Sequence, residues 1–112
     1  KEIENAKTGS GNDVVNGSHS DNQFYTGGGN DIIKTLNGND FVHLEGVHGN
    51  DTIKDFVVGQ DTLVLHDIDD YSATATEDGL LITTFMGSEI VGTVHLDDVF
   101  IEDDFQEVIF AI

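Results

Sequence analysis

The chain has 112 residues and a formal net charge of −18, because 22 acidic residues outnumber four basic ones. This charge excludes DNA and anionic membrane surfaces as partners and favours divalent cations, which relieve the self-repulsion of a compact acidic chain. The sequence contains no cysteine, so no disulfide holds the fold, and its 38% of hydrophobic residues argues against a disordered acidic tail.

Residues 1–7 are mostly polar and are expected to lead in from a preceding domain or repeat. The sequence shows no amino-terminal signal peptide and no membrane-spanning segment. Because it opens at Lys1 without a methionine, we expect a fragment of a larger protein. Its length fits a single domain.

A short repeat runs from Thr8 to Leu65. Each unit joins a glycine-rich turn, an Asn-Asp pair and a short apolar stretch. The key residues are spaced by nine residues at first and then by eleven and ten: Asp13, Asn22, Asp31, Asp40, Asp51 and Asp61. A fixed short period of this kind indicates a stack of repeated structural units.

The residue two positions after each key residue is apolar: Val15, Phe24, Ile33, Val42, Ile53 and Leu63. A short strand centred on that residue would point its side chain inward, because alternate residues of a strand face opposite sides. Glycines supply the turns between such strands. The sequence therefore predicts an all-β parallel β-roll over residues 1–66, with two nonapeptides in each coil, and a bulge where Leu44 and Glu45 are inserted.

Turns on the same side of such a roll stack two units apart. Asp13 then lies over Asp31, Asp31 over Asp51, and Asp40 over Asp61. Stacked carboxylates repel each other unless a cation lies between them. Carboxylate oxygens with backbone carbonyls suit a hard ion with six to eight ligands, and Ca²⁺ fits better than Mg²⁺, which keeps its waters. We expect roughly three to five calcium ions.

The candidate ligands are the key residues, their neighbours and the turn residues between them. The full set is Asp13, Asp21, Asn22, Asp31, Asp40, Asp51, Asp55, Asp61, Gly9, Ser10, Gly11, Gly27, Gly28, Gly29, Asn37, Gly38, His48, Gly49 and Gly59. Asn22 replaces an acid, so the site it would form with Asp40 is expected to be weak or empty unless Asp21 substitutes. Asp55 is equally well a ligand or a solvated turn residue.

No catalytic residues are expected. The sequence has no G-x-S-x-G and no H-E-x-x-H motif, and the well-placed carboxylates are committed to the turns. The five histidines show no paired spacing and are expected on the surface or in strands. The chain is therefore predicted to be a non-catalytic module.

The glycine period stops after Leu65, and residues 67–112 are predicted to form an antiparallel β-rich cap. Residues 71–76, 80–86 and 90–96 are separated by turn sequences and form a meander. The apolar face of the meander would cap the open end of the roll, since an uncapped stack would expose a strand edge. Asp97 is expected to start a short helical turn. Phe105 and residues 108–112 are expected to pack as a last strand.

Several segments resemble a known family. Residues 46–51 (GVHGND) and 26–31 (TGGGND) are near-complete copies of the nonapeptide of RTX (repeat-in-toxin) calcium-binding β-rolls. Residues 3–6 (IENA) and the exit at 53–65 (IKDFVVGQDTLVL) resemble the start and close of the C-terminal roll of serralysin-type secreted proteases. The resemblance covers the first 60% of the chain closely and the rest loosely.

The resemblance implies a secreted calcium-binding module of a larger exported protein. Such modules stay unfolded in the low-calcium cytoplasm, fold outside the cell, and leave by type 1 secretion with an uncleaved signal in their C-terminal region. Calcium ions, the secretion machinery and a parent catalytic domain would be the partners of a monomer. The alternative is a carbohydrate- or surface-binding module of an adhesin or polysaccharide-modifying enzyme, for which Tyr25, Phe41 and Tyr71 are the candidate contacts.

Overall fold

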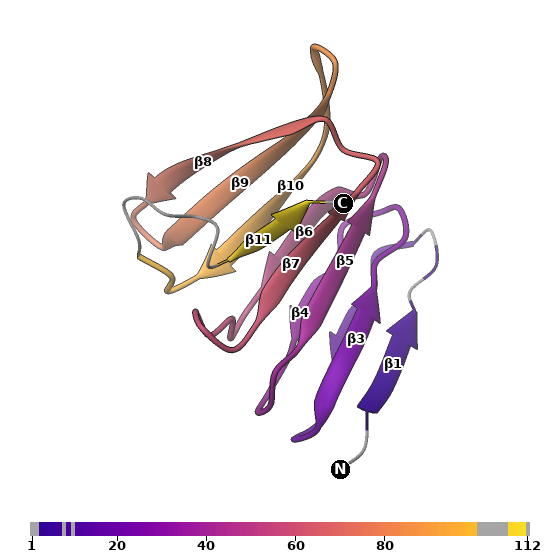
Figure 1. Cartoon of the computed structure of the whole chain (residues 1–112), viewed down its shortest axis with the longest axis vertical. Helices are drawn as coiled ribbons and strands as arrows, with labels where there is room; N and C mark the ends of the chain where they lie inside the picture. Colours follow the sequence, from indigo (N-terminus) through magenta and orange to yellow (C-terminus); the bar gives the residue numbers. More distant parts are fainter. Residues whose placement is uncertain (1–2, 8, 10, 101–107, 112) are drawn as a thin grey trace.

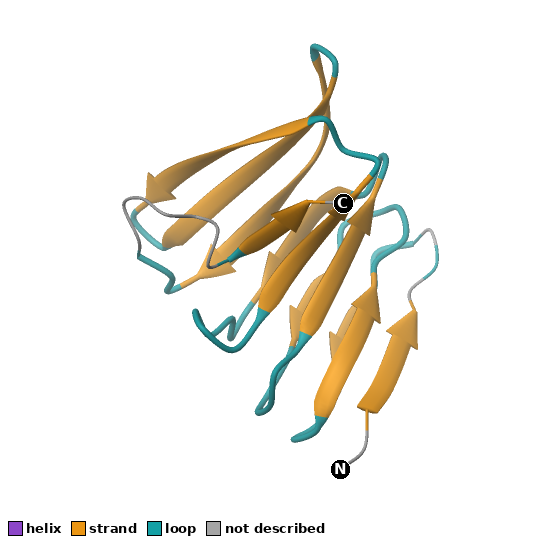
Figure 2. Ribbon diagram, in the orientation of Figure 1, coloured by secondary structure: helices purple, strands orange, loops and turns teal. Residues whose placement is uncertain are grey.

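Two β-sheets make up the molecule (Figure 1). The structure, a computed structural model, describes residues 3–7, 9, 11–100 and 108–111, and this part of the chain contains strands and loops but no helix (Figure 2). The first sheet has the order β1-β3-β5-β7-β11 and the second β2-β4-β6-β10-β9-β8. Successive strands of the repeat region thus alternate between the sheets, which confirms the predicted all-β roll.

The strands of the first sheet are β1 (Ile3–Lys7), β3 (Asp21–Tyr25), β5 (Phe41–Glu45), β7 (Thr62–His66) and β11 (Ile109–Ala111). Those of the second are β2 (Val14–Asn16), β4 (Ile32–Lys34), β6 (Gly49–Ile53), β8 (Asp70–Thr76), β9 (Gly79–Met86) and β10 (Glu89–Asp97). The pairs β1–β3, β3–β5, β5–β7, β2–β4 and β4–β6 are all parallel. Each coil therefore stacks directly on the next.

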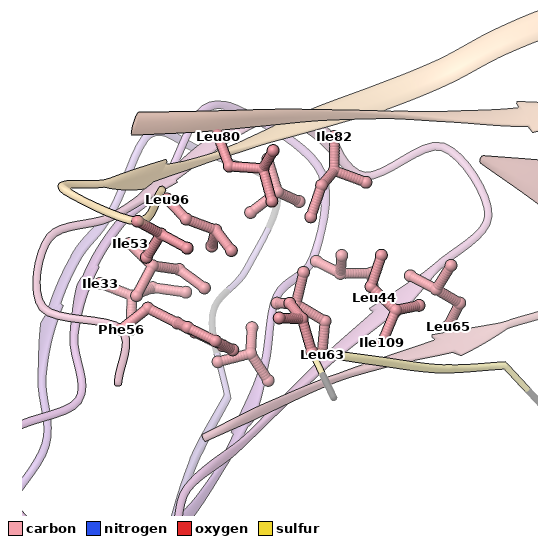
Figure 3. Close-up of a cluster of buried hydrophobic side chains, with 14 of the residues drawn as sticks. Ile33, Leu44, Ile53, Phe56, Leu63, Leu65, Leu80, Ile82, Leu96 and Ile109 are labelled. Atoms are coloured by element: carbon pink, nitrogen blue, oxygen red, sulfur yellow. The ribbon is translucent and has the colours of Figure 1, made fainter. Parts of the chain in front are cut away.

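The core lies between the two sheets (Figure 3). Five of the six apolar residues predicted to point inward are buried, namely Phe24, Ile33, Val42, Ile53 and Leu63, and Val15 is partly buried and packs against them. Side chains of the second sheet, such as Ile33 and Ile53, lie opposite Leu44 and Leu63 of the first. The alternation of strand side chains thus places one apolar residue of each unit inside.

Strand β5 shows that the expected bulge at Leu44 and Glu45 is wrong. Its side chains alternate regularly between exposed and buried, and both residues pair in unbroken register with Leu65 and His66 of β7. The inserted residues simply lengthen β5. A two-residue insertion preserves which face each side chain occupies, so the strand absorbs it without distortion.

The predicted antiparallel meander is confirmed as β8, β9 and β10. Its third strand also pairs in parallel with β6, with Gly92 opposite Gly49 and Val94 opposite Asp51. Strand β10 therefore occupies the place of a next coil and covers the edge of the second sheet through backbone hydrogen bonds. Strand β11 does the same for the first sheet, pairing in parallel with β7.

The end of the meander differs from the prediction. Asp97 is the last residue of β10, and Asp98 follows with a left-handed φ of 60°, so Asp97 does not start a helical turn. A residue in the left-handed region ends a strand in a turn instead. The predicted last strand is present as β11, whereas Phe105 lies outside the described residues.

Candidate metal-binding columns

The key acidic residues form two columns, one on each side of the roll, with the two-unit stacking that the sequence predicts. On one side, Oδ1 of Asp31 accepts the backbone N–H of Asp13 at 2.9 Å, and Oδ1 of Asp51 accepts that of Asp31 at 3.0 Å. On the other side, Oδ1 of Asp40 accepts the N–H of Asn22 at 2.8 Å. Each carboxylate therefore bridges to the preceding coil through one of its two oxygens.

The second column continues to Asp61, where the roll ends. Oδ1 of Asp61 accepts the N–H of Asp40 at 3.1 Å, and Oδ2 accepts the N–H of Val57 at 2.8 Å. The hydroxyl of Thr35 also donates to Oδ2 at 3.3 Å. Both oxygens of Asp61 thus have hydrogen-bond partners within the protein, whereas in Asp40 only Oδ1 has one.

Glycine makes this close stacking possible. Gly49 has a left-handed φ of 80°, and a Cβ at this position would overlap the carbonyl oxygen of Gly29 in the preceding coil. Gly92 of β10 in turn has no room for a Cβ beside the carbonyl oxygen of Gly49. Gly29, Gly49 and Gly92 therefore form a glycine column along which the coils, and then the meander, stack with direct backbone contact.

Asp55 closes the turn after β4, in which Leu36 is left-handed without being glycine. Leu36 has a left-handed φ of 62° at a position where the repeat usually has glycine. The carboxylate of Asp55 accepts the N–H of Thr35 at 2.7 Å through Oδ1 and the N–H of Leu36 at 2.9 Å through Oδ2. These two charge-assisted hydrogen bonds hold the strained turn, so the geometry gives Asp55 a structural role.

Sequence reasoning missed a second set of side-chain ladders, formed by the residue that precedes each key residue. Oδ1 of Asn12 accepts the N–H of Asn30 at 2.8 Å, and Oδ1 of Asn30 accepts that of Asn50 at 2.9 Å. On the opposite side, Oδ1 of Asp21 accepts the N–H of Asn39 at 2.8 Å. The recurring Asn before the key Asp was the signal. In these ladders the side chain of the earlier coil accepts the N–H of the later coil, whereas in the Asp columns the side chain of the later coil accepts the N–H of the earlier one.

Asp21 therefore takes the place of an asparagine in this ladder. Asn22, the one amide among the key residues, folds back on its own turn: its Oδ1 accepts the Ser18 hydroxyl at 3.2 Å, and its Nδ2 donates to the Ser18 carbonyl at 3.4 Å. The amide is buried, and both its oxygen and its nitrogen have a partner in their own turn. It lacks the charge that the carboxylates of the other units carry.

The electrostatics of the columns favour a bound cation. Burial, together with the nearby charge of Asp61, raises the pKa of Asp40 to about 7, and burial likewise raises the pKa of Asp61. The Oδ2 atoms of Asp13 and Asp40 are buried and have no hydrogen-bond partner. Buried oxygens without partners are costly, so each marks a position where a metal ion would be stabilising.

The residues present fit an oxygen-ligated ion. Among the described residues, no three His, Cys, Asp or Glu side chains converge on one point. Each ion would therefore be held by one or two carboxylates together with backbone carbonyls of the glycine turns, a donor set that Ca²⁺ accepts readily.

The other candidate ligands lie in the turns. Gly9, Gly11 and Gly28 have open space around them, whereas Ser10 lies outside the described residues. Asn37 instead directs its amide nitrogen to His19 Nδ1, at 2.9 Å.

His48 corrects the expectation that the histidines lie on the surface or in strands. It is fully buried in the turn before β6. Its Nδ1 lies 3.1 Å from Oδ2 of Asp51, and its Nε2 lies 2.8 Å from the hydroxyl oxygen of Thr84 on β9. The imidazole therefore contacts Oδ2 of Asp51, the last carboxylate of the first column, and connects the roll to the meander through Thr84.

Asp40 gives a pH-dependent prediction for the calcium-free protein. Its carboxyl binds a proton more tightly in the folded chain (pKa about 7) than at its ordinary value of 3.8. This contribution to stability is fully present below pH 3.8 and is lost as the pH rises through about 7. In chelator, the folded fraction measured by circular dichroism should therefore fall as the pH rises from about 4 to about 7.

Asp40→Asn mimics the protonated acid and should remove this part of the pH dependence. In chelator at pH 8, where the parent chain is expected to be mostly unfolded, the variant should show a larger folded fraction, and it should gain less from added calcium. Far-ultraviolet circular dichroism curves recorded with and without calcium measure both effects. Glu89→Gln, a change at an exposed acid, serves as the charge-matched control. If the control shifts the curves as much as Asp40→Asn does, net charge rather than the buried carboxyl is responsible.

Comparisons with known proteins agree with the fold described above. The family model for the peptidase M10 serralysin C-terminal region matches residues 1–95. The crystal structure of the extracellular lipase LipA from Serratia marcescens superposes with a TM-score of 0.60 at 20% sequence identity. The match covers 96% of this chain and 21% of the lipase chain, and at this identity it shows a shared fold. No curated protein matches in sequence. In the described residues, no helix of membrane-crossing length and apolarity occurs.

Proposed function

Because the chain belongs to the serralysin C-terminal family, whose RTX-type repeats bind calcium, we propose that it is a non-catalytic module that folds when it meets Ca²⁺ outside the cell. In this proposal the module supports the export and stability of a larger protein. The observation that carries the proposal is the pair of buried, partnerless oxygens on Asp13 and Asp40 inside stacked acidic columns.

The proposed mechanism couples folding to the metal. Without calcium, the buried carboxylates must either hold protons or repel each other, and a glycine-rich chain loses much conformational entropy on folding. Each site with a dissociation constant of about 10⁻⁴–10⁻³ M adds about 1 kcal/mol at millimolar calcium. Several sites are thus needed, and carboxylates such as Asp31 and Asp40, which lie between two coils, make their occupation cooperative.

The proposed role in export follows from this coupling. In a compartment with little calcium the chain stays unfolded, which type 1 secretion requires, and it folds after it reaches the extracellular medium. Residues 67–112 are proposed to contain the uncleaved export signal. The activity of the protein that carries the module is proposed to lie in another domain, because the chain spans 21% of the length of the lipase that it matches.

A calcium titration followed by far-ultraviolet circular dichroism tests the proposal. In chelator at pH 8 the spectrum should be mostly coil, and it should become that of a β protein cooperatively as calcium is added. Magnesium at the same concentrations is the control and should produce much less structure, since it keeps its waters. A β spectrum in chelator that calcium leaves unchanged would contradict calcium-triggered folding.

The geometry does not favour the alternative of carbohydrate binding. Tyr25 and Phe41 lie on the outer face of the first sheet, but the ring of Tyr25 stacks on that of His43 with centroids 4.4 Å apart and an angle of 7° between the planes. One face of the Tyr25 ring is thus covered by the imidazole of His43. Tyr71 packs against the core cluster. Among the described residues, these three side chains therefore do not form a row of open ring faces.

A further inference from the structure

A small cavity lies where strands β1, β3, β5 and β7 of the first sheet end. It has a volume of about 240 Å³, and Lys7, Tyr25, Gly27, His43, Glu45 and His66 contribute to its lining. His43 and Glu45 alternate along β5 on its outward face, and Glu45 is the strand partner of His66 on β7. His43 and His66 therefore lie side by side on two neighbouring strands of one face.

The two imidazoles face each other directly. His43 Nδ1 lies 2.8 Å from His66 Nε2, and the ring centroids are 5.1 Å apart. On its other side, His43 Nε2 lies 2.6 Å from Oε1 of Gln23. An amide oxygen only accepts hydrogen bonds, so Nε2 of His43 carries the proton and Nδ1 of the neutral ring has a lone pair. His66 Nε2–H donates to that lone pair in the tautomers assigned from this network.

Two features keep His43 ready to act as a ligand. Burial, and to a smaller extent His66, lower the pKa of His43, so its ring is neutral at physiological pH. Its remaining N–H is held by the Gln23 oxygen. Metal-binding histidines almost always donate the non-coordinating N–H to such an acceptor, which fixes the tautomer and the orientation of the ring.

We propose that His43 and His66 bind a divalent transition-metal ion of the zinc class on this face, with water completing the coordination. Imidazole nitrogens suit Zn²⁺ and Cu²⁺, whereas Ca²⁺ takes oxygen ligands, so this site is chemically distinct from the acidic columns. On binding, His66 moves its proton from Nε2 to Nδ1, and the lone pairs of both rings then point at the ion. The acidic surface of the chain attracts cations to it.

The required movement is small. Two nitrogens at about 2.0–2.1 Å from a tetrahedral zinc ion lie roughly 3.3 Å apart. The present separation of 2.8 Å therefore has to open by about 0.5 Å, which side-chain rotation on two neighbouring strands allows. This pair has no local sequence signal, because His43 and His66 are 23 residues apart and meet only through the pairing of β5 with β7.

Isothermal titration calorimetry with zinc chloride, at saturating calcium and pH 7.5 in a non-chelating buffer, tests the proposal. The wild-type chain should bind one zinc ion through this pair, and His43→Gln and His66→Gln should each weaken binding by at least about 10-fold. Gln23→Leu should weaken it by about 10-fold while leaving both ligands in place. His95→Gln is the control and should change nothing.

Two further measurements separate the site from folding defects and from surface binding. The calcium titration by circular dichroism on each variant shows whether it still folds. On the wild-type chain, imidazole ¹⁵N spectra should show zinc shifting His43 Nδ1 and His66 Nε2 while the signals of His19 and His95 stay in place. Undiminished zinc binding in the double variant His43→Gln/His66→Gln, or ring shifts confined to other histidines, would overturn the proposal.

Discussion

Gly49→Ala is expected to destabilise the calcium-bound roll by about 3 kcal/mol or more. The new Cβ would overlap the carbonyl oxygen of Gly29, and φ at this position is 80°, where an L side chain is strained. The obstacle is backbone rather than a flexible side chain, so the two coils would have to separate. Because their separation also breaks the hydrogen bond between Asp31 and Asp51, the variant should need more calcium to fold.

Urea unfolding at saturating calcium, with a calcium titration alongside, measures both losses. Gly28→Ala is the matched control from another turn: no atom lies within 4 Å of the place that its Cβ would take, and its φ is not left-handed. This control should change stability by less than about 1 kcal/mol. Equal losses in the two variants would show that the general flexibility of glycine, and not the glycine column, limits the stack.

Ile33→Ala is the second change with a large expected effect. Ile33 on β4 is 1% exposed and packs in the core between the sheets (Figure 3). Truncating a buried isoleucine to alanine removes apolar burial and leaves a cavity, which typically costs about 2–5 kcal/mol. The loss should appear as a lower urea midpoint with an unchanged dependence on urea concentration, because the fold is kept.

The neighbouring Ile32 provides the control for this change. It lies on the same strand but points outward and is 38% exposed. Ile32→Ala should cost no more than about 1 kcal/mol, mainly through the lower β-propensity of alanine. Similar losses at the two positions would mean that β4 is not half-buried in the described register.

The repeat made much of the fold predictable. The nine-residue spacing alone places alternate strands in opposite sheets, and the apolar residue two positions after Asp31 or Asp40 is buried as expected. The contact between Asp13 and the Asp31 carboxylate follows from the same period. These features were predictable because a periodic chain repeats one local solution, so each unit supports the interpretation of the others.

Features without a period were missed. His48 is buried because β10 pairs with β6, which brings Thr84 to the imidazole, and no local signal indicates a partner that is 36 residues away. Asp97 has the side chain of a helix cap, yet the hydrogen bonds of β10 extend the strand through it. In both cases long-range pairing overrides the local preference, and one sequence by itself does not reveal such pairing.

The pairing of β10 with β6 also determines how such an array can vary in length. The hairpin partner β9 occupies the other side of β10, so no further coil can be added to the second sheet beyond it. At the opposite end, the described strands β1 and β2 each pair on one side only, so extra coils can join there by the same ladder. Duplication of nonapeptides therefore extends the array in a single direction, and the meander acts as a fixed terminus against which arrays of different lengths are built.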